Sequence, residues 1–311
     1  MIKLTEKATM LDSKVNTKMN HGDTDRQSPM AGCSDEDHQR YWSATPEERQ
    51  QTLHNVYENI DPLDPHATFR DHNLRGLEIA AFKKHITSPG DILDFGCGNG
   101  YTLLSIAEDL DWPMTGVDYS QNMINGSKGL RKNWQKPLKS DPKFLCEDCI
   151  KYISQVPDNS LDYILSARVL LNMPDRETQH QIIRDVYRAL KPGGRYLMCE
   201  GSATGFEALN DLRETMGLSR IPATSAENLS SLRFVDDEIE KFVSDVGFNL
   251  IAKEGFNLYF IISRVVNPLL IAPDSPKFNA PINEIASSLQ ATQPMQAGLG
   301  SNTLWVLEKA T

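Results

Sequence analysis

Short apolar runs alternate with stretches of helical periodicity between residues 91 and 200. Runs with the length and composition of buried strands lie at 91–95, 114–118, 143–147, 161–167 and 195–200. Helices are expected over 101–110, 120–134 and 177–190, and Lys191-Pro192-Gly193-Gly194 would end the last of them. This alternation is typical of an α/β protein with a parallel, doubly wound sheet.

The alternation loosens beyond residue 201. Helical patterns cover 204–217 and 236–247, and two further strands are expected at 248–256 and 302–309. The residues between those two strands have a helical periodicity of their own, and a connection of that length is normally functional. The sequence therefore predicts seven strands, with a helical insertion before the last one.

No strand pattern precedes residue 90. Residues 1–36 are polar and lack an apolar period, so a disordered tail is expected. Thr45-Pro46-Glu47-Glu48 has the pattern of a capping box, and Thr68-Phe69-Arg70-Asp71 suggests a second helix that runs to about Ile86. We expect residues 37–88 to form a helical cap or lid and 89–311 to form the sheet domain.

The most informative segment is Asp94-Phe95-Gly96-Cys97-Gly98-Asn99-Gly100, which follows an apolar strand and opens a helix. Glycines there let the backbone turn sharply and approach a ligand that a Cβ would block. Asp118 ends the next strand, where a carboxylate can accept both hydroxyls of a ribose. A nicotinamide dinucleotide prefers G-x-G-x-x-G, and Tyr101 replaces the third glycine of that pattern.

Several features between about residues 90 and 200 resemble class I S-adenosylmethionine-dependent methyltransferases. Besides the glycine loop and Asp118, they are Glu147-Asp148-Cys149, Ser166-Ala167-Arg168-Val169-Leu170 and the run ALKPGG at 189–194. The resemblance implies a Rossmann-like, doubly wound seven-stranded sheet, with S-adenosylmethionine as cofactor and S-adenosylhomocysteine as product. The cofactor-binding residues it implies are Asp94, Gly96, Cys97, Gly98, Gly100, Asp118, Tyr119, Asp148, Cys149 and Arg168. Asp94 is expected to orient the glycine loop through backbone N–H groups.

Three further stretches resemble a bacterial small-molecule branch of that family, which includes methionine S-methyltransferases and saccharide methyltransferases. They are FRDHNLRGLEI at 69–79, RVLLNMPD at 168–175 and ISRVVNPLLIAPDSP at 262–276. A carboxylate-bearing acceptor such as methionine is therefore the leading hypothesis, with O-methylation of a sugar as the alternative. A thioether loses no proton on methylation, so we assign no catalytic base.

The cap and the carboxyl edge of the sheet supply the expected substrate contacts. They are Tyr41, Trp42, Arg70, Arg75, Asn172 and Glu200. An arginine of the cap would hold the acceptor carboxylate and Glu200 its ammonium group. The competing interpretation is that Arg70 and Arg75 pair with Asp71 and Glu78 on a solvated helix face.

The formal net charge of −10 argues against a nucleic-acid partner. Five scattered cysteines suggest a reducing compartment, and Cys146 and Cys149 lack the further ligands of a metal site, so no metal is expected. Charged and polar residues interrupt the most apolar stretch, 257–272, and no secretory signal is evident. We expect a cytoplasmic protein with a small-molecule substrate and no membrane partner, and a homodimer is one candidate assembly. A nicotinamide oxidoreductase and a non-catalytic protein that keeps the fold are the other hypotheses.

Overall fold

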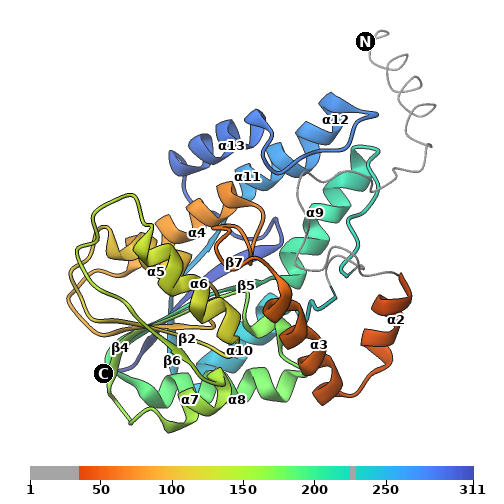
Figure 1. The fold of residues 1–311 in the computed structure, drawn as a ribbon. Coiled ribbons are helices and arrows are strands. Elements are labelled where there is room, and N and C mark those ends of the chain that lie inside the picture. Colours follow the sequence, from red (N-terminus) through yellow and green to blue (C-terminus); the bar gives the residue numbers. More distant parts are fainter. Residues whose placement is uncertain (1–34, 225–228) are drawn as a thin grey trace, which may run out of the picture.

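A seven-stranded sheet runs through the middle of the computed structural model, which describes residues 35–224 and 229–311 (Figure 1). The strand order is β3-β2-β1-β4-β5-β7-β6. The strands are β1 (Ile92–Phe95), β2 (Met114–Asp118), β3 (Lys143–Cys146), β4 (Leu161–Ala167), β5 (Leu190–Gly201), β6 (Phe248–Gly255) and β7 (Asn302–Lys309). β1 to β5 pair in parallel, and β7 runs antiparallel to both of its neighbours. All seven strands expected from the sequence are confirmed.

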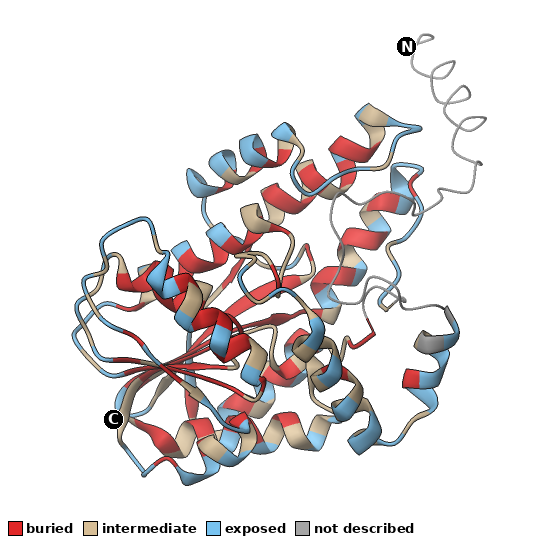
Figure 2. Cartoon of the chain, viewed as in Figure 1, coloured by how far each residue is buried: buried red, intermediate tan, exposed pale blue. Residues whose placement is uncertain are grey.

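Helices cover both faces of the sheet. One face carries α4 (His72–His85), α5 (Tyr101–Ala107) and α6 (Gln121–Lys132), and the other carries α7 (Cys149–Gln155), α8 (Arg176–Ala189) and α10 (Asp236–Val246). β7 shows how two cores arise, because Leu304 and Val306 pack toward the first face and Trp305 and Leu307 toward the second. Figure 2 shows the strands and the inward helix faces as buried. The helix α7, capped by Asp148, is an addition to the predicted elements.

The helical insertion before the last strand is also confirmed. It consists of α11 (Asn257–Ile261), a five-residue π-helix η2 (Ile262–Val266), α12 (Asn267–Ile271) and α13 (Pro281–Ala291). With α9 (Ala203–Thr215), the insertion packs on the sheet face that carries α4 (Figure 1). Within the described ranges, no helix is both long and apolar enough to cross a bilayer.

The expected cap is divided between two places. α4 begins at His72 with Asp71 as its N-cap, so the prediction that Thr68 caps this helix is wrong. Its apolar stripe, including Leu74, Leu77 and Phe82, belongs to the main core. α4 is therefore a layer of the sheet domain and not part of a lid.

Two helices lie apart from that layer, α2 (Asp35–Ser43) and α3 (Pro46–Asn59) (Figure 1). The capping box is confirmed: Glu48 N donates to Thr45 Oγ1, and Thr45 N donates to Glu48 Oε2. α2 begins within the last two residues of the expected tail, whose first 34 residues lie outside the described part of the chain. Tyr41 of α2 and Leu53 of α3 form a small satellite cluster with Leu229.

Candidate functional site

A cleft opens at the carboxyl ends of β1, β2 and β4, which is where ligands bind in open α/β sheets. The empty space of the cleft, with its open mouth and the solvent there included, is about 1030 Å³. α3 forms one wall and the segments that follow β1 and β4 form the floor. The lining residues are Gln50, Leu53, Tyr57, Thr68, Arg75, Asp94, Gly96, Cys97, Gly98, Thr102, Asp118, Tyr119, Asp148, Cys149, Ile150, Ala167, Arg168, Val169, Asn172 and Met173.

The glycine loop has the left-handed backbone that its sequence predicts. The φ angles of Gly96, Gly98 and Gly100 are 72°, 54° and 74°. A Cβ on Gly96 would lie 2.6 Å from Val169, and one on Gly98 would lie 2.9 Å from Thr68. Gly100 does not line the cleft but begins α5 as its N-cap. Close packing and backbone geometry thus both require glycine in this loop.

Asp118 holds the loop in place. Its Oδ2 accepts a 2.8 Å hydrogen bond from Gly98 N, and its Oδ1 accepts a 2.9 Å bond from Ser120 N. Burial raises the pKa of this carboxyl to about 6, although both backbone bonds act against the shift. Each oxygen keeps a second lone pair for a ligand hydroxyl.

Asp94 does not orient the loop, so that prediction is wrong. The loop amides Gly96 N and Cys97 N donate to Val117 O, at 2.9 and 3.0 Å. Asp94 is buried beneath the cleft, and within the described chain its Oδ2 has no hydrogen-bond partner. Burial raises its pKa to about 7, although Arg75 lowers it. A buried carboxylate oxygen without a partner suits a cationic ligand group.

Arg75 supplies a buried guanidinium beside Asp94. Nη1 donates to Pro65 O at 2.7 Å, and the group lies 4.6 Å from the centre of the Tyr101 ring. Burial lowers the pKa of Arg75 to about 10, so it stays charged at neutral pH. Its Nε finds no partner in the described part of the chain. Tyr101, which replaces the third glycine of a dinucleotide loop, is therefore a packing partner for this cation.

A second guanidinium, that of Arg168, lines the cleft after β4. Arg168 has a φ of 59°, which is unusual for a residue with a side chain and often marks a functional site. Glu78 of α4 accepts a hydrogen bond from its Nη1, and the guanidinium carbon lies 3.7 Å from the centre of the Phe69 ring. Asn302 donates to the other oxygen of Glu78 at 2.7 Å. The guanidinium is thus held by a carboxylate that is itself fixed.

Arg75 and Glu78 are not on a solvated helix face, so the competing interpretation of their charges is wrong. Both are almost fully buried, with 3% and 2% of their surface exposed. Glu78 pairs with Arg168 and not with a neighbour on its own helix. The signal in the sequence was the position of both charges next to the apolar stripe of α4, which turns toward the core.

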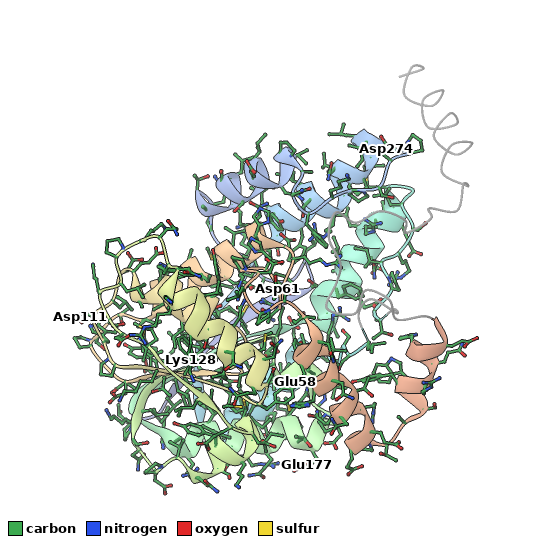
Figure 3. All side chains as sticks on the ribbon, viewed as in Figure 1. Glu58, Asp61, Asp111, Lys128, Glu177 and Asp274 are labelled. Atoms are coloured by element: carbon green, nitrogen blue, oxygen red, sulfur yellow. The ribbon has the colours of Figure 1, made fainter. Side chains whose placement is uncertain are left out.

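α3 belongs to the expected cap, but its lining residues were not among the predicted site residues. Gln50, Leu53 and Tyr57 lie on one face of the helix, and Gln50 Nε2 donates to Asn172 O at 3.2 Å. The other end of α3 is bound to α6, because Asn122 Nδ2 donates to Tyr57 O at 3.0 Å and Asn122 N donates to Glu58 Oε1 at 3.3 Å. Figure 3 labels Glu58 where α3 meets α6. The three-and-four spacing of the lining residues was the available signal.

Four of the expected substrate contacts lie outside the lining, while Arg75 and Asn172 are part of it. Tyr41 is packed in the satellite cluster, and Trp42 is 42% exposed. Arg70 precedes α4 and is also absent from the lining. The structure therefore does not bring Tyr41, Trp42 and Arg70 into the described lining of the cleft, and their contact with a substrate stays a prediction.

Glu200 is fully buried and has a different task. Its Oε1 accepts hydrogen bonds from Ser166 Oγ, Val169 N and Leu170 N at 3.0, 3.0 and 3.1 Å. Burial raises the pKa of Glu200 to about 7, although these bonds lower it. Glu200 fixes the short helix η1 (Leu170–Asn172) and does not reach the cleft. Its predicted contact with a substrate ammonium group is wrong.

Known proteins with similar sequences are methyltransferases. The family described as a methyltransferase domain matches residues 92–194. Phosphoethanolamine N-methyltransferase 3 of Arabidopsis thaliana is 34% identical over 113 residues, which are 36% of this chain and 21% of that protein. Demethylmenaquinone methyltransferase of Listeria welshimeri is 27% identical over 155 residues, which are 48% of this chain and 62% of that protein. The chain thus matches less than two thirds of the length of either relative.

A solved structure shows the same fold. The PH0226 protein of Pyrococcus horikoshii superposes with a TM-score of 0.52 at 18% identity, over 83% of this chain and 99% of that one. These matches favour the methyltransferase interpretation over a nicotinamide oxidoreductase, and they do not address the methionine S-methyltransferase branch. Residues 92–194 match the methyltransferase-domain family, and the seven-stranded sheet has the Rossmann-like fold expected from the sequence.

Proposed function

We propose that this protein transfers the sulfonium methyl group of S-adenosylmethionine to a small acceptor and releases S-adenosylhomocysteine. The observation that carries the proposal is the left-handed glycine loop joined to Asp118 at the floor of the cleft. In the reaction, an acceptor lone pair attacks the methyl carbon as the carbon–sulfur bond breaks, and the bonding pair stays on the cofactor sulfur. The protein contributes alignment and exclusion of water.

The strand order suggests how the cofactor lies. Asp148 and Cys149 follow β3 and would flank the adenine, and Asp118 and Tyr119 at the end of β2 would contact the ribose. Gly96, Cys97, Gly98 and Gly100 follow β1 and would let the methionine part pass close to the backbone. Asp94 and Arg75 then offer one anion and one cation to the ammonium and carboxylate of that part. Arg75, expected as a substrate contact, is thereby proposed as a cofactor contact.

The acceptor would lie beyond the methionine part, between α3 and the segment after β4. Among the described residues that line the cleft, none is a histidine, lysine or glutamate. The three lining aspartates all belong to the cofactor side, and burial raises the pKa of Tyr57 to about 12, so this phenol stays neutral. A wall without a base suits an acceptor that loses no proton, such as the thioether of methionine. The sulfonium product would be stabilised by the aromatic face of Tyr57.

The acceptor is also proposed to carry a carboxylate. The cleft has two guanidinium groups, Arg75 and Arg168, whereas the cofactor has one carboxylate. Arg168, expected from the resemblance as a cofactor contact, follows β4 on the far side of β1 from the ribose site, so it is proposed as an acceptor contact instead. Asn172 is the polar neighbour on the same turn, because its Nδ2 donates to Arg168 O at 3.0 Å.

Two assays test the proposed function. Calorimetric titration with S-adenosylhomocysteine and with NAD⁺ should show binding of the first only. Labelled S-adenosylmethionine should then be offered with amino acids, phosphoethanolamine and nucleotide sugars. Methylation of methionine or a related carboxylate supports the proposal, and methylation of sugars alone supports the saccharide alternative. No binding of S-adenosylhomocysteine would reject both, in favour of a non-catalytic protein.

We also propose that α2 and α3 act as the lid, since α4 belongs to the core. Removal of residues 1–60 should lower the turnover number at least about 100-fold, because Gln50, Leu53 and Tyr57 leave the cleft and water enters. Removal of residues 1–34 alone is the control and should leave the turnover number unchanged. An equal fall of the turnover number in both truncated proteins would contradict this assignment. So would full activity of the protein that lacks residues 1–60. Circular dichroism shows whether each truncated protein is folded.

Cofactor affinity should depend on pH through Asp94. Its pKa of about 7 in the free protein means that the carboxyl is mostly protonated below that pH and cannot pair with an ammonium group. We expect the dissociation constant of S-adenosylhomocysteine to rise up to about 10-fold from pH 8 to pH 6. Asp118 contributes at the acidic end of this range, because its pKa is about 6.

The control for this pH dependence is Asp94→Asn, which keeps the shape and has no titrating group. Its affinity should change with pH only below about pH 6.5, where Asp118 titrates. The folding stability of the ligand-free wild type should change with pH in the opposite direction to the cofactor affinity. The raised pKa of Asp94 favours the protonated folded state, so the free energy of unfolding should fall as pH rises through about 7. A wild-type dissociation constant that matches the variant at every pH would contradict the role of Asp94.

A further inference from the structure

Residues 64–71, which precede α4, form a cover over the glycine loop. Thr68 lines the cleft next to Gly98, where an added Cβ would lie 2.9 Å from the Thr68 methyl group. Asn99 Nδ2 donates to Asp64 O at 2.8 Å, and Arg75 Nη1 donates to Pro65 O at 2.7 Å. In this cover, Asp64 is therefore attached to the glycine loop and Pro65 to Arg75.

The end of the cover is attached to the helical insertion. Asp71 caps α4 by accepting from Leu74 N at 3.1 Å. The same Oδ1 accepts a 2.5 Å hydrogen bond from Tyr259 Oη, and Oδ2 pairs with Arg264 Nη2. Asp71 has 2% of its surface exposed, so this is a buried ion pair between segments far apart in the chain.

The partners of Asp71 come from an unusual element. Arg264 lies in the π-helix η2, a rare form that often occurs at functional sites. Its guanidinium carbon is 5.0 Å from the centre of the Phe278 ring, and its carbonyl accepts a hydrogen bond from Arg213 of α9. Ser263 Oγ donates to Tyr259 O at 2.6 Å and supports the same turn. Tyr259 and Arg264 are thus themselves held from two sides.

Asp71 is one helical turn before Arg75 and three residues after Thr68. Loss of one partner of a buried ion pair leaves the other charge without compensation, and the chain then moves to solvate it. Movement of Asp71 would displace both Thr68 and Arg75, which line the cleft near the proposed methionine position. The insertion is therefore coupled to the cleft through the side chain of Asp71.

We infer that Arg264 and Tyr259 are positioning residues that set the affinity for the cofactor by holding Asp71. This inference rests on the proposed function, because Arg75 and Thr68 matter to the cofactor only if it binds as described. The insertion before the last strand would then be a brace for the cofactor site. Its role is distinct from that of α3, which would face the acceptor.

The test compares full-length variants by calorimetry with S-adenosylhomocysteine and by steady-state kinetics. Arg264→Ala should raise the dissociation constant about 10- to 50-fold and raise the cofactor KM with little change in kcat. Arg264→Lys, which keeps the charge, should recover part of the affinity. The control is Arg220→Ala, which removes a comparable guanidinium paired with Glu207, Asp211 and Glu214 at the surface of α9. That variant should bind as the wild type does.

Tyr259→Phe keeps the inference testable if Arg264→Ala does not fold. It removes one hydroxyl from Asp71 and should weaken binding about 3- to 10-fold. Folded variants with reduced thermal stability but unchanged cofactor affinity and KM would overturn the inference and leave only a structural ion pair. Failure of the wild type to bind S-adenosylhomocysteine would instead reject the proposed function, so the two failures are distinguishable.

Discussion

Replacement of Asp118 by alanine is expected to weaken the binding of S-adenosylhomocysteine by roughly 30- to 700-fold. Hydrogen bonds from two ribose hydroxyls to a buried charged acceptor contribute about 2–4 kcal/mol together, and that free energy corresponds to this range. The change also frees Gly98 N, which donates to Asp118 Oδ2 at 2.8 Å in the wild type, so the glycine loop loses a support as well. Calorimetric titration measures the effect directly.

The matched control is Asp185→Ala on α8, where the carboxylate lies 3.6 Å from Arg188 on the opposite face of the sheet. It makes the same chemical change without touching the cleft, and its cofactor affinity should equal that of the wild type. The cofactor affinity of Asp118→Asn should lie between those of Asp118→Ala and the control, because an amide oxygen still accepts one hydrogen bond. Wild-type affinity in Asp118→Ala would reject the assignment of the ribose to this carboxylate.

The elements of the sheet could be predicted because their signals are local. A buried strand such as Ile92–Phe95 and the glycine loop after it are encoded by neighbouring residues, and so is the capping box at Thr45. α7 has only seven residues, too few for an apolar period to stand out, and unlike the equally short α5 it has no glycine loop before it to mark its start. The predicted start of α4 was three residues too early, because Thr68 and Asp71 are both good N-cap residues.

The side-chain partners within the site could not be predicted in the same way. Arg168 finds Glu78 at a separation of 90 residues, and Arg264 finds Asp71 at a separation of 193. Such pairs depend on how helices pack on the sheet, which no local pattern encodes. Glu200 shows that a correctly predicted position does not fix the direction of its side chain. Its place at the carboxyl end of β5 was correctly foreseen, but its carboxylate is turned toward the backbone amides of η1 and away from the cleft.

The two arginines of the cleft give the sharpest test of the acceptor. Arg168→Lys keeps a positive charge but loses the planar fork that binds a carboxylate through two hydrogen bonds. We expect the KM for a carboxylate acceptor such as methionine to rise about 10- to 100-fold, while the cofactor KM stays within about 2-fold. Arg75→Lys should show the reverse pattern, with the larger change in the cofactor KM. Arg184→Lys, at an exposed pair with Glu177 on α8, is the control for lysine substitution.

Comparison of methionine with its carboxamide separates recognition of the carboxylate from general damage to the site. The wild type should prefer the carboxylate, because hydrogen bonds from a guanidinium to an anion are stronger than those to a neutral amide. In Arg168→Lys this preference should fall by the same factor by which the KM for methionine rises, since the carboxamide never used the fork. An equal loss for both acceptors would mean that Arg168 shapes the wall after β4, where the ring of Phe69 lies under it, without contacting the substrate. Turnover of nucleotide sugars that is indifferent to Arg168→Lys would reject the carboxylate acceptor and require a base that the described lining of the cleft does not supply.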